Sequence, residues 1–305
     1  MKISQAPSLR FLLFALASFL LFSCSKNSDT FSSEDQQTSA NESAQECTTN
    51  ELDDIATSVL NSSTVSGSPG GRTGGPLDDR FNCDGTSVVF SNVGTDKTSG
   101  TVTITFPPEG CTDKKGNVRK GSIVVSWSGG KWYKTGSSHT VTQDGYSINS
   151  VGISGTETVT CTASTENPLS VIWSIAANHR ATWPDGTTAT RKVNKTRKWD
   201  HTATEDMFTL SNGTGSFSAA EGTNRHGRTY KTYITSPLIY LGSCGKSNKV
   251  FIPVKGEKVI TWIGTNGKSK SMTIDYGSGA CDNTYTVTAG TIVKTLTAKN
   301  DSSND

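Results

Sequence analysis

The sequence predicts an all-β domain, an antiparallel meander that forms a large twisted sheet or sandwich, with one short N-terminal helix and an internal structural repeat. Three observations predict it. Apolar and polar residues alternate in short runs between residues 82 and 298. Turn-forming residues separate these runs. The hydrophobic content is only 32%, which fits a sheet that buries one face and leaves the other in water.

The N-terminus has the layout of a secretory signal. Two basic residues precede the apolar run of residues 11–22, and the small residue Ser23 follows it. A membrane-spanning helix needs about 20 apolar residues, so this run is too short to cross a bilayer. We therefore interpret residues 1–23 as a signal peptide rather than as a permanent membrane span.

The residues at the end of this signal, Leu21-Phe22-Ser23-Cys24, resemble a lipobox. The resemblance implies a diacylglyceryl thioether on Cys24, cleavage before it, and acylation of the new amino terminus. Two or three acyl chains hold a protein firmly to a membrane, whereas one holds it weakly. By analogy with other lipoproteins, Ser25 at the next position favours the outer membrane. Orientations toward the periplasm and toward the cell surface both stay open.

Loss of the signal also changes the charge. It removes Lys2 and Arg10, which leaves 27 of the 29 basic side chains beside 27 acidic ones and a formal net charge of zero. Nucleic-acid binding needs a basic surface, so no nucleic-acid partner is expected. Attachment to the membrane is expected to come from the lipid and not from basic residues.

Two segments lead from the anchor to the β-region. Residues 24–46 are nearly all polar after Cys24 and are predicted to be a flexible tether. Residues 47–81 are predicted to hold a short helix over 48–61 and then a Gly/Pro/Ser linker. Thr48-x-x-Glu51 is a candidate capping box. An apolar stripe follows at helical spacing, formed by Leu52, Ile55, Ala56, Val59 and Leu60. Such a helix is expected to pack on the sheet.

The β-region itself spans residues 82–298 and precedes a polar tail, 299–305. Period-two alternation marks residues 102–106, 123–127, 156–160 and 284–288. Hairpin turns are predicted at residues 183–187, 225–228 and 265–268, of which the last contains an Asn-Gly pair. Short connections of this kind join antiparallel neighbours, because parallel strands need longer crossovers.

An internal repeat lies within this region. Residues 102–111 match residues 272–281 at an offset of 170, and residues 121–127 match residues 290–296 at an offset of 169. Each unit is therefore expected to contain a strand, a turn with a cysteine, and a returning strand that begins with glycine.

Six cysteines remain besides Cys24, which is the even number typical of a disulfide framework in an exported protein. None forms a CxxC motif, so zinc-ribbon and thioredoxin-like sites are not supported. Six cysteines allow 15 pairings. If the repeat units are equivalent, the natural pairs are Cys83–Cys111 and Cys244–Cys281. Cys47–Cys161 would then remain and would join the helix to the sheet.

Several motifs resemble those of an uncharacterised family of Bacteroidota lipoproteins. They are Thr103-Ile-Thr-Phe, Gly110-Cys111-Thr-Asp, Gly116-x-x-Arg-Lys-Gly121-x-Ile, Gly155-Thr-Glu-Thr-Val-Thr160, Ser236-Pro-Leu238 and Ile274-Asp-Tyr-Gly-x-Gly-x-Cys-Asp282. The resemblance spans about residues 83–297. It implies a duplicated all-β domain on a lipoprotein, and it implies no activity.

One strand is a candidate ligand site. Arg191, Lys195, Arg197 and Trp199 share one face of a predicted strand that is polar on both faces. Such a strand is expected to be exposed or to form a sheet edge, where lysine protects against aggregation. The alternative is a basic stripe beside an aromatic platform, formed by Trp173, Trp183 or Trp199, that binds an anionic glycan or surface polymer.

The sequence contains no constellation of catalytic or metal-binding residues that would support an enzyme, and no cofactor is expected. Three hypotheses for function follow. The first is a non-enzymatic cell-envelope lipoprotein with a structural or binding role and a polysaccharide or another envelope protein as partner. The second is a surface glycan-binding module. The third is a periplasm-facing carrier of lipid or another apolar cargo, which requires a groove with apolar residues on both sides of a curved sheet.

Overall fold

The computed structural model describes residues 32–60, 79–81, 83–114, 116–166, 169–202, 204–215, 218–244, 250, 252–264 and 266–297. These residues belong to one compact unit, Phe31–Asp305. The predicted signal peptide, Cys24, residues 61–78 of the predicted linker and the predicted tail lie outside the described residues. None of the described helices is long and apolar enough to cross a membrane.

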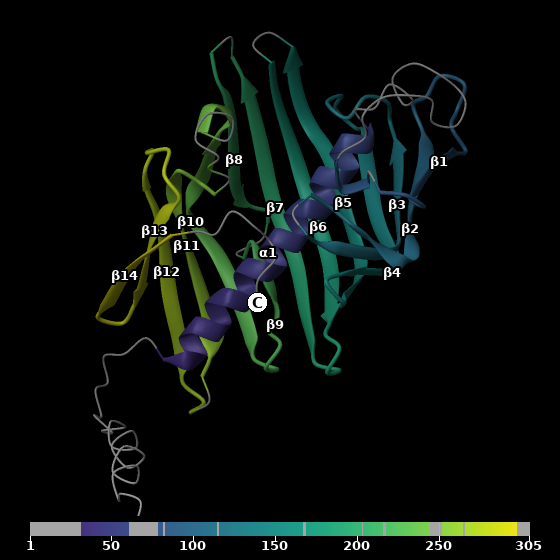
Figure 1. The fold of residues 1–305 in the computed structure, drawn as a ribbon. Coiled ribbons are helices and arrows are strands. Elements are labelled where there is room, and N and C mark those ends of the chain that lie inside the picture. The colour runs from purple at the N-terminus through teal and green to yellow at the C-terminus, as the bar shows by residue number, and fades with distance from the viewer. Residues whose placement is uncertain are drawn as a thin grey trace, which may run out of the picture. The chain divides into compact units, whose positions relative to one another are not determined.

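Among the described residues, fourteen strands form one antiparallel sheet in meander order, which confirms the predicted fold class (Figure 1). Only β9 leaves the simple order, because it pairs with both β7 and β10. The strands are β1 (Ser87–Ser91), β2 (Gly100–Thr112), β3 (Val118–Ser128), β4 (Ser138–Ile148), β5 (Val151–Glu166), β6 (Leu169–Thr182), β7 (Thr188–His201), β8 (Asp206–Asn212), β9 (Ala220–Thr223), β10 (Thr229–Leu241), β11 (Lys255–Ile263), β12 (Ser269–Ser278), β13 (Thr284–Ala289) and β14 (Ile292–Thr297). A 3-10 turn, η1 (Asp79–Phe81), precedes them.

A long helix, α1 (Ser33–Leu60), lies diagonally across one face of the sheet (Figure 1). The helix begins at Ser33 and not at Thr48, so the prediction of a flexible tether up to residue 46 is wrong. A capping box starts it, because Ser32 N donates to Asp35 Oδ2 at 2.9 Å and Asp35 N donates to Ser32 Oγ at 3.2 Å. This motif was the local signal for the helix start.

The hydrophobic pattern did not predict the first half of α1, because the side chains that this half buries are polar. Its buried side chains recur at intervals of three or four residues, as a helix requires: Asp35, Thr38, Glu42, Gln45 and Thr49. The second half continues the stripe with the predicted apolar residues. Leu52, Ile55 and Val59 are each at most 1% exposed.

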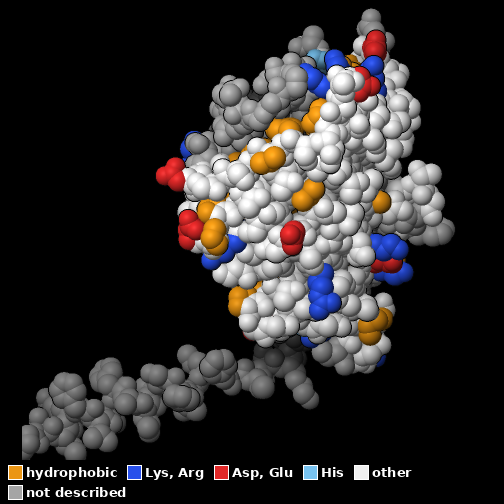
Figure 2. Space-filling view, turned by 90° about the vertical axis from the view of Figure 1, so that its right-hand side faces the viewer, with side chains coloured by type: hydrophobic (Ala, Val, Ile, Leu, Met, Phe, Trp, Pro, Cys, Tyr) orange, Lys and Arg blue, Asp and Glu red, His pale blue; other side chains and the backbone are white. Residues whose placement is uncertain are grey.

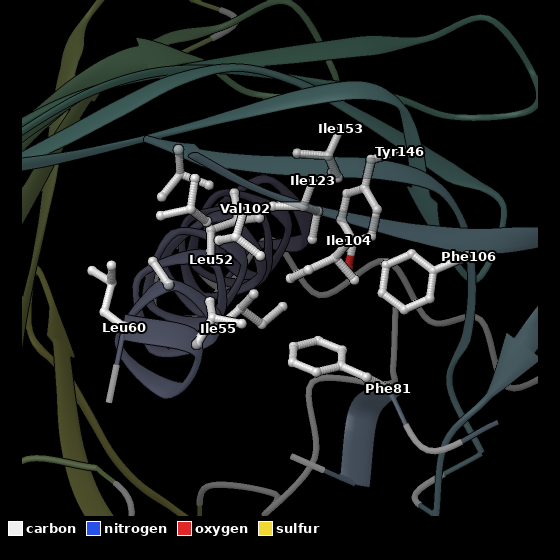
Figure 3. Packing of buried hydrophobic residues seen from close by; sticks show 14 of the residues in the cluster. Leu52, Ile55, Leu60, Phe81, Val102, Ile104, Phe106, Ile123, Tyr146 and Ile153 are labelled. Atoms are coloured by element: carbon white, nitrogen blue, oxygen red, sulfur yellow. The ribbon is translucent and has the colours of Figure 1, made fainter. Parts of the chain in front are cut away.

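The main apolar core lies where this second half meets β2, β3 and β4. Figure 3 shows Leu52 and Ile55 beside Val102, Ile104 and Ile123 of the sheet. Full burial of an aliphatic side chain of this size contributes about 1.5–3 kcal/mol. The helix is therefore anchored on the sheet mainly through its C-terminal half.

The opposite face of the sheet is rich in threonine and serine. Along β2, for example, Thr101, Thr103 and Thr105 alternate with the fully buried Val102 and Ile104. Figure 2 shows a surface of mostly uncharged polar side chains and backbone, with scattered hydrophobic residues and few charges. Many of the charged residues lie instead between the sheet and α1.

Two disulfides confirm the pairing expected from the repeat, Cys83–Cys111 and Cys244–Cys281. The third expected pair is wrong, since Cys161 is a buried free thiol. It lies on β5 with Sγ 3.6 Å from the Ala163 carbonyl oxygen. Cys47 belongs to α1, and its side chain is outside the described part of the structure.

The two repeat units correspond in their first strands, β2 and β12, and in the disulfide-bonded cysteine that follows each. Their returning strands differ. Gly121 lies within β3, which pairs directly with β2, whereas Gly290 lies in the turn between β13 and β14. Residues 290–296, which match residues 121–127 in sequence, therefore lie at β14. This strand is separated from β12 by β13, whereas β3 directly follows β2.

Candidate ligand-binding site

The basic residues singled out by the sequence lie inside the molecule. Arg191, Lys195, Arg197 and Trp199 do share one face of β7. However, β7 pairs with β6 on one side and with β8 and β9 on the other, so it is a central strand. Arg191 is 1% exposed. The prediction of an exposed or edge strand is therefore wrong. The basic residues of this face pair with acidic residues of α1 and do not point into solvent.

Each basic residue on this face of β7 pairs with a carboxylate of α1. The pairs are Arg191–Glu42, Lys195–Glu46 and Arg197–Asp53. The same chemistry extends to β3, β11 and β12 through Arg119–Glu51, Lys258–Glu46 and Lys270–Asp35. Burial alone raises the pKa of Glu46, yet Lys195 and Lys258 hold it well below its usual range. The helix α1 thus covers the basic residues that the sequence suggested as a ligand-binding stripe.

A second buried group lies beneath the helix and includes Glu157 and His179. The His179 Nε2 atom is 3.9 Å from Glu157 Oε2. Burial and the nearby Asp53 raise the pKa of Glu157 well above its usual range. Burial and Arg191 lower the pKa of His179 to about 4. His179 is consequently neutral near pH 7, and the raised pKa of Glu157 favours its protonated form. Both side chains are almost fully covered, so this pair has no access to a substrate.

The aromatic residues beside the basic stripe form a continuous cluster. Trp132, from the β3–β4 loop, stacks on Trp173 of β6 with ring centroids 5.6 Å apart, and its centroid lies 5.7 Å from that of Trp199. Trp199 in turn stacks on Phe208 of β8 at 6.1 Å. Trp173 Nε1 donates to the Trp132 carbonyl oxygen at 3.1 Å, which fixes the loop against the sheet. Trp173 and Trp199 therefore belong to one platform, whereas Trp183 lies elsewhere.

A cavity of about 420 Å³ adjoins this cluster. Its apolar walls come from Leu60 at the end of α1, Val159, Trp127, Trp132, Tyr133 and Trp173. Its polar lining comes from two loops and the start of β4: Asp96, Lys97, Thr98, Lys131, Lys134, Ser137, Ser138 and His139. The volume lies in the range of about 300–1,000 Å³ that is usual for small-molecule sites.

One polar group of the cavity, the hydroxyl of Ser137, is placed to recognise a ligand. Ser137 is buried, and its hydroxyl has no hydrogen-bond partner among the described residues. Buried polar groups normally have partners, so an unmatched hydroxyl in a cavity wall favours a polar ligand. Asp96 accepts hydrogen bonds from the Thr98 backbone and hydroxyl, which leaves the three lysines as the dominant charges at this site.

Sequence reasoning identified Trp173 and Trp199 but missed Trp132 and Tyr133. Both lie in the loop of residues 129–137, between β3 and β4. Two glycines followed by aromatic residues between two lysines are the signal that could have identified it. Binding residues lie disproportionately on loops, and tryptophan and tyrosine are enriched at binding interfaces.

The described residues include no group of three histidine, cysteine or acidic side chains that could hold a metal ion. The arrangement is suited to binding, through aromatic faces, hydroxyl groups and ammonium groups. Searches of protein-family models, curated proteins and solved structures give no match to this chain.

Proposed function

We propose that this protein is a lipid-anchored lipoprotein of the cell envelope that binds an anionic carbohydrate, without catalysis, in the aromatic cavity. The observation that supports it most strongly is the combination of tryptophan walls with the unmatched hydroxyl of Ser137. The proposal selects the second of the three hypotheses and gives it a defined site.

Carbohydrate is the ligand class that fits this mixed lining. A sugar ring has apolar C–H faces that pack on aromatic rings and hydroxyl groups that pair with buried polar atoms. A purely apolar cargo would leave the hydroxyl of Ser137 unmatched. The face of the sheet that a lipid carrier would use is filled by α1 and its ion pairs, so the carrier hypothesis has less support.

The charge at the cavity favours an acidic sugar. Lys97, Lys131 and Lys134 line it against the single carboxylate of Asp96. Lys131 and Lys134 are exposed, so they are free to approach a carboxylate or sulfate on the ligand. Exposed ammonium groups contribute modestly at physiological salt and attract ligands of opposite charge.

The test is a glycan array probed with the full mature chain and with two matched variants. Trp132→Ala removes the central ring of the cavity cluster, and we expect it to abolish retention of acidic glycans. Trp183→Ala is the control, because Trp183 lies on the opposite end of the sheet against Arg225. Equal retention by both variants would refute the cavity as the site. Retention of neutral and acidic glycans alike would refute the charge preference.

The anchor rests on the lipobox resemblance of Leu21-Phe22-Ser23-Cys24. Cells fed a labelled fatty acid should incorporate it into the wild-type chain and not into a Cys24→Ser variant. Label in the Cys24→Ser variant would refute the anchor. Protease treatment of whole cells then distinguishes a surface-exposed domain, which is degraded, from a periplasmic one, which is protected.

A further inference from the structure

The sheet has two ends that differ in their relation to α1. The helix begins near β12, where Lys270 Nζ lies 3.2 Å from Asp35 Oδ1, and it ends at Leu60 beside the aromatic cavity. Figure 1 shows the helix running diagonally from one end of the strands to the other. The chain that leads to Cys24 therefore enters at one end of the sheet, and the cavity lies at the other.

Three hairpin turns lie together at the end where α1 begins, and we call them the anchor-side turns. They are residues 183–187, 224–228 and 264–268, between β6 and β7, β9 and β10, and β11 and β12. Arg225 Nη2 lies 2.5 Å from Asp185 Oδ2, which joins the first two turns. Tyr230 of β10 pairs with Trp262 of β11, which places the second turn next to the third. Arg225 N also donates to Asn41 of α1 at 3.2 Å.

The distance from the lipid to these turns is limited by the chain. Only eight residues, 25–32, separate Cys24 from the first helical residue, because α1 begins at Ser33. A fully extended chain spans at most about 3.3–3.6 Å per residue, so eight residues reach about 30 Å. A domain tethered this closely, through the helix end beside the anchor-side turns, meets the bilayer with that end first.

The anchor-side turns have the composition of a membrane interface. Ile263, at the base of the third turn, is 50% exposed, whereas most other large hydrophobic residues are covered. Trp183 is half-buried and stacks under Arg225 with the guanidinium 4.8 Å from the ring centroid. The three turns contain three basic residues, Arg225, Arg228 and Lys268, and one acidic residue, Asp185. Tryptophan, exposed aliphatic residues and basic side chains are the residues favoured at headgroup level.

We propose that the anchor-side turns form the membrane-contacting surface of this protein, with Ile263 in the interfacial layer and the exposed Lys268 near anionic headgroups. This inference depends on the proposed lipid anchor at Cys24. It places the aromatic cavity at the end of the domain that points away from the bilayer, where a soluble or polymeric ligand has access.

The test uses the full lipidated protein on vesicles of phosphatidylethanolamine and phosphatidylglycerol. An environment-sensitive fluorophore is attached at Ile263→Cys and, as the matched control, at Lys131→Cys in the cavity loop. The unsubstituted protein gives the background from its native thiols. We expect a blue shift and a gain in emission on vesicles for the Ile263 label and no change for the Lys131 label. A Lys268→Glu substitution should reduce the shift at Ile263, and Lys131→Glu should not.

Vesicle flotation separates the two proposals. If the wild-type chain does not float with the vesicles, the anchor itself is wrong. If it floats but the two labels respond equally, or only the Lys131 label responds, the assignment of the anchor-side turns is overturned while the anchor stands.

Discussion

The two halves of α1 meet the same face of the same sheet through different chemistry. All described side chains of residues 33–49 are polar, and the buried ones pair with basic residues of the sheet or lie among them. From Leu52 onward the buried residues are aliphatic and pack into the main apolar core, except for Asp53, which pairs with Arg197. The helical period is continuous across both halves. The comparison shows that a helix can be held on a sheet by a charged stripe as regularly as by an apolar one.

The two kinds of interface are expected to respond differently to mutation. Buried ion pairs contribute little net stability but are costly to break on one side, whereas apolar contacts lose stability in proportion to the volume removed. The polar half should also depend on pH, which the apolar half should not.

The largest effect should come from breaking the polar half at its most buried pair. We expect Arg191→Ala to cost about 3–5 kcal/mol of unfolding free energy, because it removes the nearest charge partner of the buried Glu42 and leaves only Lys258, at 3.9 Å. Urea titration followed by circular dichroism measures this. The double variant Arg191→Met/Glu42→Leu is the control and should recover most of the loss. A loss in the double variant as large as in the single one would contradict a charge-based interface.

In the apolar half, Ile55→Ala should cost about 2–5 kcal/mol, since Ile55 is fully covered in the core. The loss should stay constant between pH 5 and pH 8, as no titrating group changes. Thr57→Ala, on the partly exposed side of the same helix, should be nearly neutral. A strongly pH-dependent loss for Ile55→Ala would show that the two halves are not independent.

The buried carboxyl of Glu157 provides a pH test of the polar half. Its folded pKa is raised above the unfolded value of 4.5, so the wild-type chain loses stability as pH rises above about 4.5. Glu157→Gln removes this loss, and the variant should gain stability over the wild type as pH increases. Thermal melts across pH 5–9 measure the difference. A constant difference over this range would show that Glu157 titrates normally.

The second pH effect has the opposite sign and comes from His179. Its folded pKa is about 4 against an unfolded value of 6.5, so its contribution is complete above pH 6.5 and is lost as pH falls toward 4. His179→Gln should flatten the stability profile in that window and leave it unchanged above pH 7. If the His179→Gln variant lost stability as steeply as the wild type between pH 6.5 and pH 4, other groups would cause the acid sensitivity.

The smallest effect is expected on the outer face of the sheet. The Lys231–Glu221 pair is 3.5 Å apart and exposed on both sides. Lys231→Ala should therefore change the unfolding free energy by less than about 1 kcal/mol. A loss comparable to that of Arg191→Ala would contradict the distinction between inner and outer charges.

The same contrast explains which features were predictable from the sequence. Alternating strands, the Asn-Gly turn and the apolar stripe from Leu52 to Leu60 follow local periodicity, and the repeat correctly paired four cysteines. The polar half of α1 was missed because hydrophobic pattern methods do not register a buried stripe of Glu, Asp, Thr and Gln. The basic strand β7 was misplaced at an edge for the same reason, since its partner carboxylates lie about 140–150 residues away.

The aromatic cavity could be predicted only in part. Trp173 and Trp199 were expected to act as a platform. The composition of the β3–β4 loop marks it as a candidate binding loop but does not indicate that Trp132 packs against both of them. That position depends on the ring contacts of Trp132 with β6 and β7 and on the hydrogen bond from Trp173 Nε1 to the Trp132 carbonyl oxygen. Such contacts are determined by tertiary structure and not by the sequence of either segment.

The most direct test of the proposed function is a crystal structure of the protein with an acidic oligosaccharide selected on the glycan array. The proposal predicts a sugar ring against Trp127 or Trp132, a sugar hydroxyl paired with Ser137, and the acidic group within reach of Lys131 or Lys134. A sugar bound on the threonine-rich outer face, with the cavity unchanged, would contradict it.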